Sequence, residues 1–193
     1  STPVAFVTED MGPSVELWDL DKASLIETFD NGGESEGCVF DDENQVLFIS
    51  EEETNGVLKA YDLSQDLPFE SPFIVDSRKG NIGGDPEGVA LYKTSATEGY
   101  VVLSSQGDNK YNLYDRNAPY AFITSFQISD QDGGIDGTSE TDGISVSSFN
   151  LGGEFSKGLM VAQDGYNYDG DELKNQNFKI TSFKEVLKKT NLD

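Results

Sequence analysis

Residues 132–144 read DGGIDGTSETDGI, and their side chains could bind a cation. This stretch holds four glycines and four carboxylates, those of Asp132, Asp136, Glu140 and Asp142. Calcium takes about six to eight oxygen ligands from carboxylates, amides and backbone carbonyls, and glycine leaves neighbouring carbonyls accessible. A solvated surface loop has the same composition, however. Two interpretations therefore compete: a loop that only faces water, and a loop that carries calcium.

The charge of the whole chain favours the cation. Asp and Glu number 36 against 13 Lys and Arg in 193 residues, which gives a net charge of −23. Such a charge repels nucleic acids and anionic membranes, and it opposes compaction unless cations neutralise it. Disorder is the alternative, but 36% hydrophobic and 11% aromatic residues are typical of a folded domain. We therefore expect divalent counter-ions on a folded surface, and neither nucleic acid nor a membrane as partner.

The residue types that are missing narrow the chemistry. The chain has no histidine, which excludes histidine general bases, the serine–histidine triad and the usual zinc and haem sites. Its one cysteine, Cys38, can form no disulfide within the chain, and apolar neighbours indicate a buried thiol. No apolar run approaches the roughly 20 residues of a membrane span. No signal peptide is visible either, as expected for a mature secreted chain.

Short runs rich in Val, Ile, Phe, Tyr and Leu, separated by Gly, Asn, Asp and Ser, predict many short strands. The clearest are 46–50, 100–105, 120–128 and 158–163. A second set, VELWDL, LKAYDL and YNLYDR, has an aromatic residue followed by Asp in each member. One helix is predicted, at 181–190. The sequence therefore predicts an all-β fold with a short C-terminal helix.

The predicted strands form a repeat. Each unit begins with an acid–glycine pair, at Glu36, Glu87 and Asp142, and continues with a strand, a loop and a more apolar strand. Four-stranded units that repeat about every 40–50 residues indicate a β-propeller, which needs about 4–8 blades. This chain holds about three to four blades. We therefore expect residues 1–193 to be a partial propeller that missing sequence, another chain or a second copy completes.

The repeat also brings acidic residues together. In a hairpin, the start of the first strand lies beside the end of the second. This predicts three pairs: Glu36 with Glu51 or Glu52, Glu87 with Gln106, and Asp142 with Gln163. Since the innermost strands of a propeller line its channel, these residues would ring one mouth of the channel. An acid–glycine pair can also simply form a turn, although a turn alone could use Asn or Ser.

Two further stretches have the composition of calcium loops, GGDPEG at 83–88 and QDGYNYDGDE at 163–172. Neither fits the EF-hand pattern. Their recurrence at equivalent positions predicts several calcium ions on one face, and magnesium is less suited because it demands tighter octahedral geometry. Metals at a channel mouth suit a phosphorylated substrate, because they neutralise phosphate and lower the pKa of an attacking water.

The sequence resembles the β-propeller phytases, which are secreted, calcium-dependent, six-bladed phosphomonoesterases. The stretches that carry the resemblance are EGCVFDDE with LFISEEE, SSQGDNKYNLYDR, DGTSETDGI, GLMVAQDGYN and NQNFK. These stretches occur in order. The resemblance as a whole extends from FVTED to FKEV and matches the C-terminal half of that fold. The resemblance implies calcium-site carboxylates at Glu36, Glu52, Asp85, Glu87 and Asp136, and amide ligands at Gln106 and Asn167. It implies catalytic roles for Glu36, Glu52 and Asp136; Asp142 belongs to the same loop.

The sequence departs from the family in two ways. Family members carry a Lys-Glu pair after the strand that corresponds to AFVT, whereas this chain has Glu9, Asp10 and Met11. The family's N-terminal half, which supplies further basic and acidic active-site residues, has no counterpart here. Four cations remain near the candidate loops, and for each we expect a solvated surface role: Arg78, Lys79, Lys110 and Arg116.

Two functions remain open. The first is a secreted or periplasmic phosphomonoesterase of the 3-phytase type, which would use calcium-activated water on inositol phosphates bound as calcium complexes. The second is a non-catalytic, secreted calcium-binding propeller that serves as an interaction module. The retained ligand set favours the enzyme, while the acid near Asp10 and the incomplete ring favour the module. The sequence assigns no substrate-binding side chain.

Overall fold

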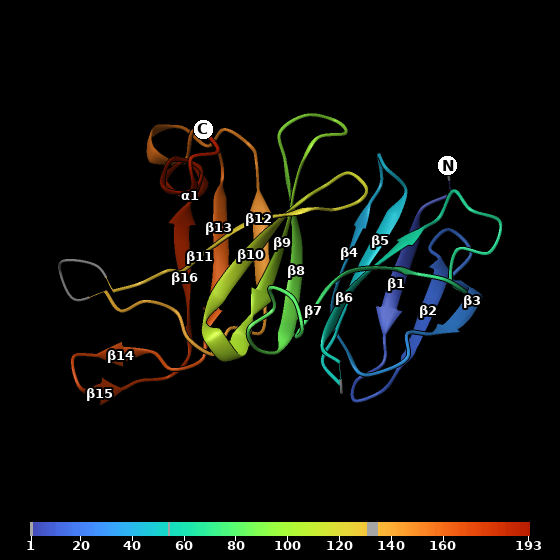
Figure 1. The fold of residues 1–193 in the computed structure, drawn as a ribbon, viewed down its shortest axis with the longest axis horizontal. Helices are drawn as coiled ribbons and strands as arrows, with labels where there is room; N and C mark the ends of the chain where they lie inside the picture. Colours follow the sequence, from blue (N-terminus) through green and yellow to red (C-terminus); the bar gives the residue numbers. More distant parts are fainter. Residues whose placement is uncertain (1, 54, 131–134) are drawn as a thin grey trace.

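The computed structural model describes residues 2–53, 55–130 and 135–193, so Asp132 and the two glycines after it lie outside the described residues. The fold is all-β, with four larger antiparallel sheets, one two-stranded ribbon and a short C-terminal helix (Figure 1). This confirms the predicted fold class. Over the part of the chain that is described, no helix is long and apolar enough to span a membrane.

The two central sheets have four strands each, and their strands pair in chain order. The first consists of β4 (Ser35–Asp41), β5 (Val46–Glu51), β6 (Val57–Asp62) and β7 (Phe73–Ser77). The second consists of β8 (Pro86–Lys93), β9 (Gly99–Ser105), β10 (Lys110–Asp115) and β11 (Phe122–Phe126), with a 3-10 turn at Gln106–Asp108. In both sheets the acid–glycine strand, the apolar strand and the aromatic–Asp strand are neighbours, as the repeat predicted.

The two terminal sheets have three strands each. The first consists of β1 (Val4–Thr8), β2 (Ser14–Asp19) and β3 (Ser24–Asp30). The last consists of β12 (Ile144–Ser147), β13 (Leu159–Asp164) and β16 (Asn177–Ser182), with a 3-10 turn at Gly153–Phe155. The ribbon of β14 (Tyr168–Asp169) and β15 (Glu172–Leu173) lies between β13 and β16 in the chain. Because β2 carries the aromatic–Asp motif, the first sheet corresponds to β5–β7 and has no acid–glycine strand among the described residues.

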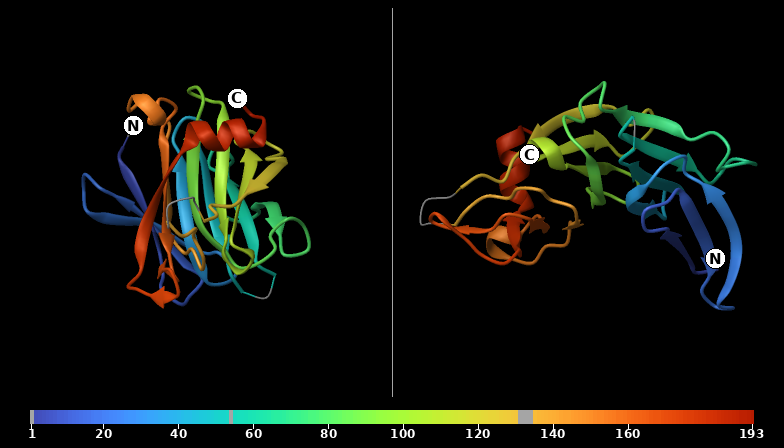
Figure 2. Two further views of the ribbon diagram at one scale, coloured as in Figure 1. Left: turned by 90° about the vertical axis from the view of Figure 1, so that its left-hand side faces the viewer. Right: turned by 90° about the horizontal axis from the view of Figure 1, so that it is seen from below.

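The sheets follow one another along an open arc (Figure 2, right). Side chains alternate along each strand, so a central strand packs against both neighbouring sheets. Leu47 and Ile49 of β5 pack with Val15 and Phe29 of the first sheet. Phe48, between them in sequence, packs in a separate cluster with residues of β9 and β10. The cores therefore lie between sheets, and each sheet holds its neighbours in place.

Helix α1 (Phe183–Thr190) covers the last junction. Its buried residues, Phe183, Val186 and Leu187, follow the helical spacing and join the cluster that includes Met160 of β13 and Val102 of β9. The Phe183 ring stacks on Tyr92 of β8 with a centroid separation of 3.9 Å. The predicted helix is confirmed, and it fixes the last sheet against its neighbour.

One predicted surface cation is instead buried. Arg116 is 0% exposed, and its Nε donates to Asp41 Oδ2 at 2.6 Å, while its Nη2 lies 2.8 Å from Glu43 Oε2. The expectation of a solvated role was therefore wrong for Arg116. Its carboxylate partners lie more than 70 positions earlier in the chain, on the neighbouring sheet, so only the fold brings them together. The Cys38 thiol is half-buried, and burial raises its pKa.

Candidate functional site

The three acid–glycine pairs meet at one place, as the repeat predicted. A depression of about 320 Å³ is lined by three equivalent triplets, residues 36–38, 87–89 and 142–144. The first two triplets belong to β4 and β8, and the third leads into β12. Each triplet contributes an acid, a glycine and an apolar residue, so three carboxylates from three sheets gather in this depression. We call this depression the mouth.

The acid–glycine pair forms a β-bulge in both complete sheets. The register between β4 and β5 shifts between Ser35 and Cys38, and that between β8 and β9 shifts between Pro86 and Val89. A bulge inserts an extra residue on one strand and redirects its side chain. The alternative considered for these pairs, a simple turn, is therefore wrong for the pairs at Glu36 and Glu87, which lie within strands, whereas Asp142 and Gly143 precede β12.

Glycine is required here because neighbouring backbones touch. A Cβ on Gly37 would lie 2.6 Å from the carbonyl oxygen of Glu87, and a Cβ on Gly88 would lie 2.6 Å from that of Asp142. The Gly88 amide donates to the Asp142 carbonyl oxygen at 2.8 Å. At Gly143, the third equivalent position, nothing lies within 4 Å of the added atom. Gly37 and Gly88 therefore lie at sheet–sheet junctions that leave no room for a side chain.

Gly37→Ala is expected to destabilise the protein, because a backbone carbonyl cannot move away from the new methyl group without separating two sheets. Overpacking of this kind costs about 1–3 kcal/mol, which corresponds to roughly 2–4 °C of midpoint per kcal/mol in a domain of this size. Gly143→Ala is the matched control and should leave the thermal midpoint of the 193-residue chain within about 1 °C. Equal midpoints for the two variants would contradict the packing described above.

Carboxylates gather around the first pair. Carboxylate oxygens of Glu34, Glu36 and Glu52 all lie within 4.8 Å of one another, and the Glu52 amide donates to the Glu34 carbonyl oxygen at 3.1 Å. Of the two predicted partners of Glu36, the structure selects Glu52. Glu51 is buried and its Oε2 lies 3.0 Å from Lys59 Nζ. No ion pair found within the described ranges neutralises the three gathered carboxylates.

Glu87 extends this cluster inward. It lines the depression together with Glu36, and only 5% of the residue is exposed. Burial, followed by the charges of Glu36, Glu52 and Asp142, raises the pKa of Glu87 to about 8. Burial and the charges of Glu34 and Glu52 likewise raise the pKa of Glu36. In the metal-free protein Glu87 therefore holds a proton near neutral pH, because it is buried beside other carboxylates.

The amide residues complete the mouth, with one difference from the prediction. The Gln106 side-chain amide donates to Asp142 Oδ1, and not to the predicted Glu87, while its backbone amide donates to the Asp85 carbonyl oxygen at 2.8 Å. The predicted contact between Asp142 and Gln163 is confirmed, since Gln163 Oε1 accepts from the Asp142 amide at 2.9 Å. Asp85 is paired with Arg78, so only part of its charge faces the cluster.

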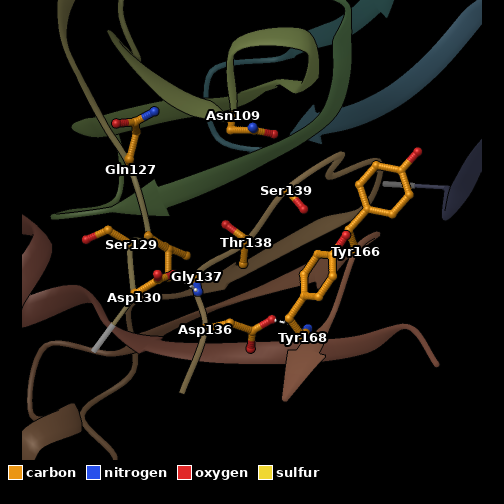
Figure 3. A pocket seen from close by; sticks show the side chains of 11 residues that line it. Asn109, Gln127, Ser129, Asp130, Asp136, Gly137, Thr138, Ser139, Tyr166 and Tyr168 are labelled. Atoms are coloured by element: carbon orange, nitrogen blue, oxygen red, sulfur yellow. Dashed lines mark hydrogen bonds between the residues drawn. The ribbon is translucent and has the colours of Figure 1, made fainter. Parts of the chain in front are cut away.

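Asp136 and Asn167 belong to a second group, centred on Lys179. Lys179 Nζ contacts Asp136 Oδ1 and, at 3.1 Å, Asn167 Oδ1. Figure 3 shows Asp136 at the edge of a polar pocket of about 410 Å³, directed toward the backbone amide of Tyr168. Burial raises the pKa of Asp136, but the bonds from Lys179 and Tyr168 outweigh it, and the net pKa is lowered. No hydrogen bond or ion pair of the described residues joins this group to the mouth carboxylates.

Two of these residues were not found from the sequence. Glu34 lies two positions before Glu36, and alternation along an extended chain would have placed both side chains on one side. Lys179 gave no signal, because a single lysine in NQNFK looks like a solvated charge until the fold buries it. The mouth as a whole presents hard oxygen donors, and no Lys or Arg of the described residues forms an ion pair with Glu34, Glu36 or Glu52. Chemically, such a donor set could hold calcium and, through it, an anionic ligand.

Comparisons with known proteins cover most of this chain. The phytase family model matches residues 19–193. The chain is 35% identical over 161 residues to the 3-phytase of Bacillus subtilis (strain 168), an alignment that covers 83% of this chain and 41% of that protein. The chain thus spans less than half the length of this curated relative. Because the family match extends over nearly the whole chain and includes all three acid–glycine pairs, the chain belongs to the phytase family.

Proposed function

We propose that this chain forms part of a calcium-dependent phosphomonoesterase that hydrolyses phytate. The observation that carries the proposal is the convergence of three acid–glycine pairs on one mouth, where the carboxylates of Glu34, Glu36 and Glu52 lack a cation partner among the described residues. Family membership and the similarity to a 3-phytase support phosphate monoesters as the substrate class.

We also propose that the four larger sheets are blades of a β-propeller. Two of these sheets have four strands and two have three, and this repeat and the succession of the sheets along an arc support the arrangement. The first sheet has no acid–glycine strand among the described residues, and Gly143 at the other end has no neighbouring backbone. Further blades, from missing sequence, another chain or a second copy, would continue the ring at these two ends.

The proposed calcium ligands are Glu36, Glu52 and Glu87, with Asp85 and Gln106 beside them. Bound calcium would neutralise the substrate phosphate and lower the pKa of the attacking water. The chain's own part is to fix these oxygens, with Glu36 and Glu87 on two bulged strands. In the metal-free protein Glu87, whose pKa is raised to about 8, holds a proton near neutral pH, and calcium would displace that proton on binding.

The net charge of the chain and its carboxylate cluster bear on the form in which the substrate binds and on where the protein is located. A chain with a net charge of −23 repels a free inositol polyphosphate, so we propose that phytate binds as its calcium complex. We propose a secreted or periplasmic location, since extracellular calcium modules bind at about 10⁻⁴–10⁻³ M and carboxylate clusters of moderate affinity fill only in such a setting.

The competing function is a non-catalytic calcium-binding module. The position for which the family resemblance implies a Lys-Glu pair holds exposed Glu9 and Asp10, and neither can attract phosphate. Under this alternative the mouth would bind calcium for stability or for a partner, and no phosphate would be released.

The test is release of inorganic phosphate from phytate by the natural assembly that contains this chain, measured in calcium and again after excess chelator. We expect release in calcium and its loss in chelator. If no phosphate appears but calcium raises the thermal midpoint, the non-catalytic module is correct. Release that persists in chelator would contradict calcium dependence and leave the phosphatase assignment in place.

A further inference from the structure

Lys179 lies at the centre of a cage of four side-chain oxygens. Its side chain is 9% exposed. The Nζ atom contacts Asp136 Oδ1, Asp164 Oδ2 at 2.8 Å, Asn167 Oδ1 at 3.1 Å and Asn177 Oδ1 at 3.2 Å. These residues come from the loop before β12, the end of β13, the segment before β14 and the start of β16. One ammonium therefore ties four segments together.

The cage is preorganised, because polar atoms of its residues that do not contact Lys179 have hydrogen-bond partners of their own. Asp136 Oδ2 accepts from the Tyr168 amide, as Figure 3 shows, and Asp164 Oδ1 accepts from the Ser139 amide at 3.0 Å. The Asn177 side-chain amide donates to Asn167 Oδ1 at 2.9 Å. Both carboxylates are thus held on one side by backbone and on the other by Lys179.

Two carboxylates and two amide oxygens converging on one point are also the donor set of a calcium site. Here the point is occupied by an ammonium, a compact charge with three N–H donors. We infer that Lys179 is the resident cation of this cage in place of a metal ion, and that it is the positioning residue for Asp136 and the loop toward Asp142. Asp136 and Asn167 are then not calcium ligands, contrary to what the family resemblance implies. This holds whether or not the protein hydrolyses phytate.

Lys179→Met removes the ammonium and leaves the buried Asp164 and the half-buried Asp136 without a counter-charge. In chelator we expect the thermal midpoint to fall by on the order of 10 °C, as for other broken buried ion pairs. In calcium we expect the variant to bind one ion more than the wild type, by equilibrium dialysis, and to recover part of the lost midpoint. The matched control is Lys174→Met, whose exposed pair with Glu172 lies on the neighbouring ribbon and should change neither quantity. An unchanged ion count in Lys179→Met, or midpoints equal to the control, would overturn the inference.

A second variant keeps the inference testable if Lys179→Met does not fold. Asp136→Asn retains an oxygen for Lys179 and should leave the number of bound calcium ions as in the wild type. Loss of one ion in this variant would show that Asp136 is a calcium ligand after all. Neither readout depends on activity, so a failure here is distinguishable from a failure of the proposed function.

Discussion

Glu36→Gln is expected to lower calcium-dependent phosphate release from phytate by about 100-fold. Glu36 lies within reach of Glu34 and Glu52 and lines the depression together with Glu87, so it adjoins every part of the proposed metal cluster. Loss of even an outer partner of a metal ligand typically costs about 10- to 100-fold in metal affinity or activity. The measurement is the initial rate of phosphate release by the natural assembly across a calcium titration.

The matched control for this variant is Glu70→Gln, because Glu70 is exposed and follows a turn remote in sequence from the mouth. It removes the same charge from the same chain, so it corrects for the change in net charge. A Glu36→Gln rate within about twofold of the Glu70→Gln rate would place the chemistry away from the three acid–glycine pairs.

The stability of the metal-free protein is expected to fall as the pH rises from about 5 to about 9. The pKa of Glu87 is raised from 4.5 to about 8 by burial and by neighbouring carboxylates. A group whose pKa is higher in the folded state stabilises that state fully below its unfolded pKa, and the effect disappears as the pH rises through the folded value. One pKa unit corresponds to about 1.4 kcal/mol, so the loss amounts to several kcal/mol, or on the order of 10 °C in the midpoint.

Thermal unfolding in chelator at several pH values measures this effect, and Glu87→Gln is the variant that isolates it. The variant cannot ionise, so its midpoint should change much less over the same range. Calcium should restore the wild-type midpoint at high pH, because the ion then supplies the counter-charge that the proton supplies at low pH. A wild-type midpoint that rises over this range in chelator would contradict the picture of an uncompensated mouth.

The repeat could be predicted from the sequence because its strands are short, apolar and punctuated by turn residues. The convergence of Glu36, Glu87 and Asp142 followed from the repeat, because the innermost strands of a propeller line one channel. The choice between Glu51 and Glu52 did not follow, because it depends on the bulge between Ser35 and Cys38, which shifts the register and was not visible in the pattern. A one-residue shift moves a side chain to the opposite face of the sheet.

Buried cations were the part that the sequence could not reveal. Arg116 lies between Asp115 and Asn117 and was expected at the surface, and Lys179 lies in a stretch, NQNFK, that gave no sign of an ion pair. Their carboxylate partners come from distant segments, Asp41 for Arg116 and Asp136 for Lys179, and only tertiary packing brings them together. The family resemblance led to an error of another kind, because it grouped residues that the structure separates. It grouped Asp136 and Asn167 with the mouth ligands, whereas the structure places them around Lys179.

The central claim is that the uncompensated carboxylates at the mouth bind calcium, and the most direct test is a crystal structure grown in calcium, with anomalous scattering used to locate the ion. The account predicts an anomalous peak among the carboxylates of Glu34, Glu36 and Glu52, and none at Lys179 Nζ. Saturating calcium with no peak at the mouth, or a peak within the Lys179 cage, would contradict it.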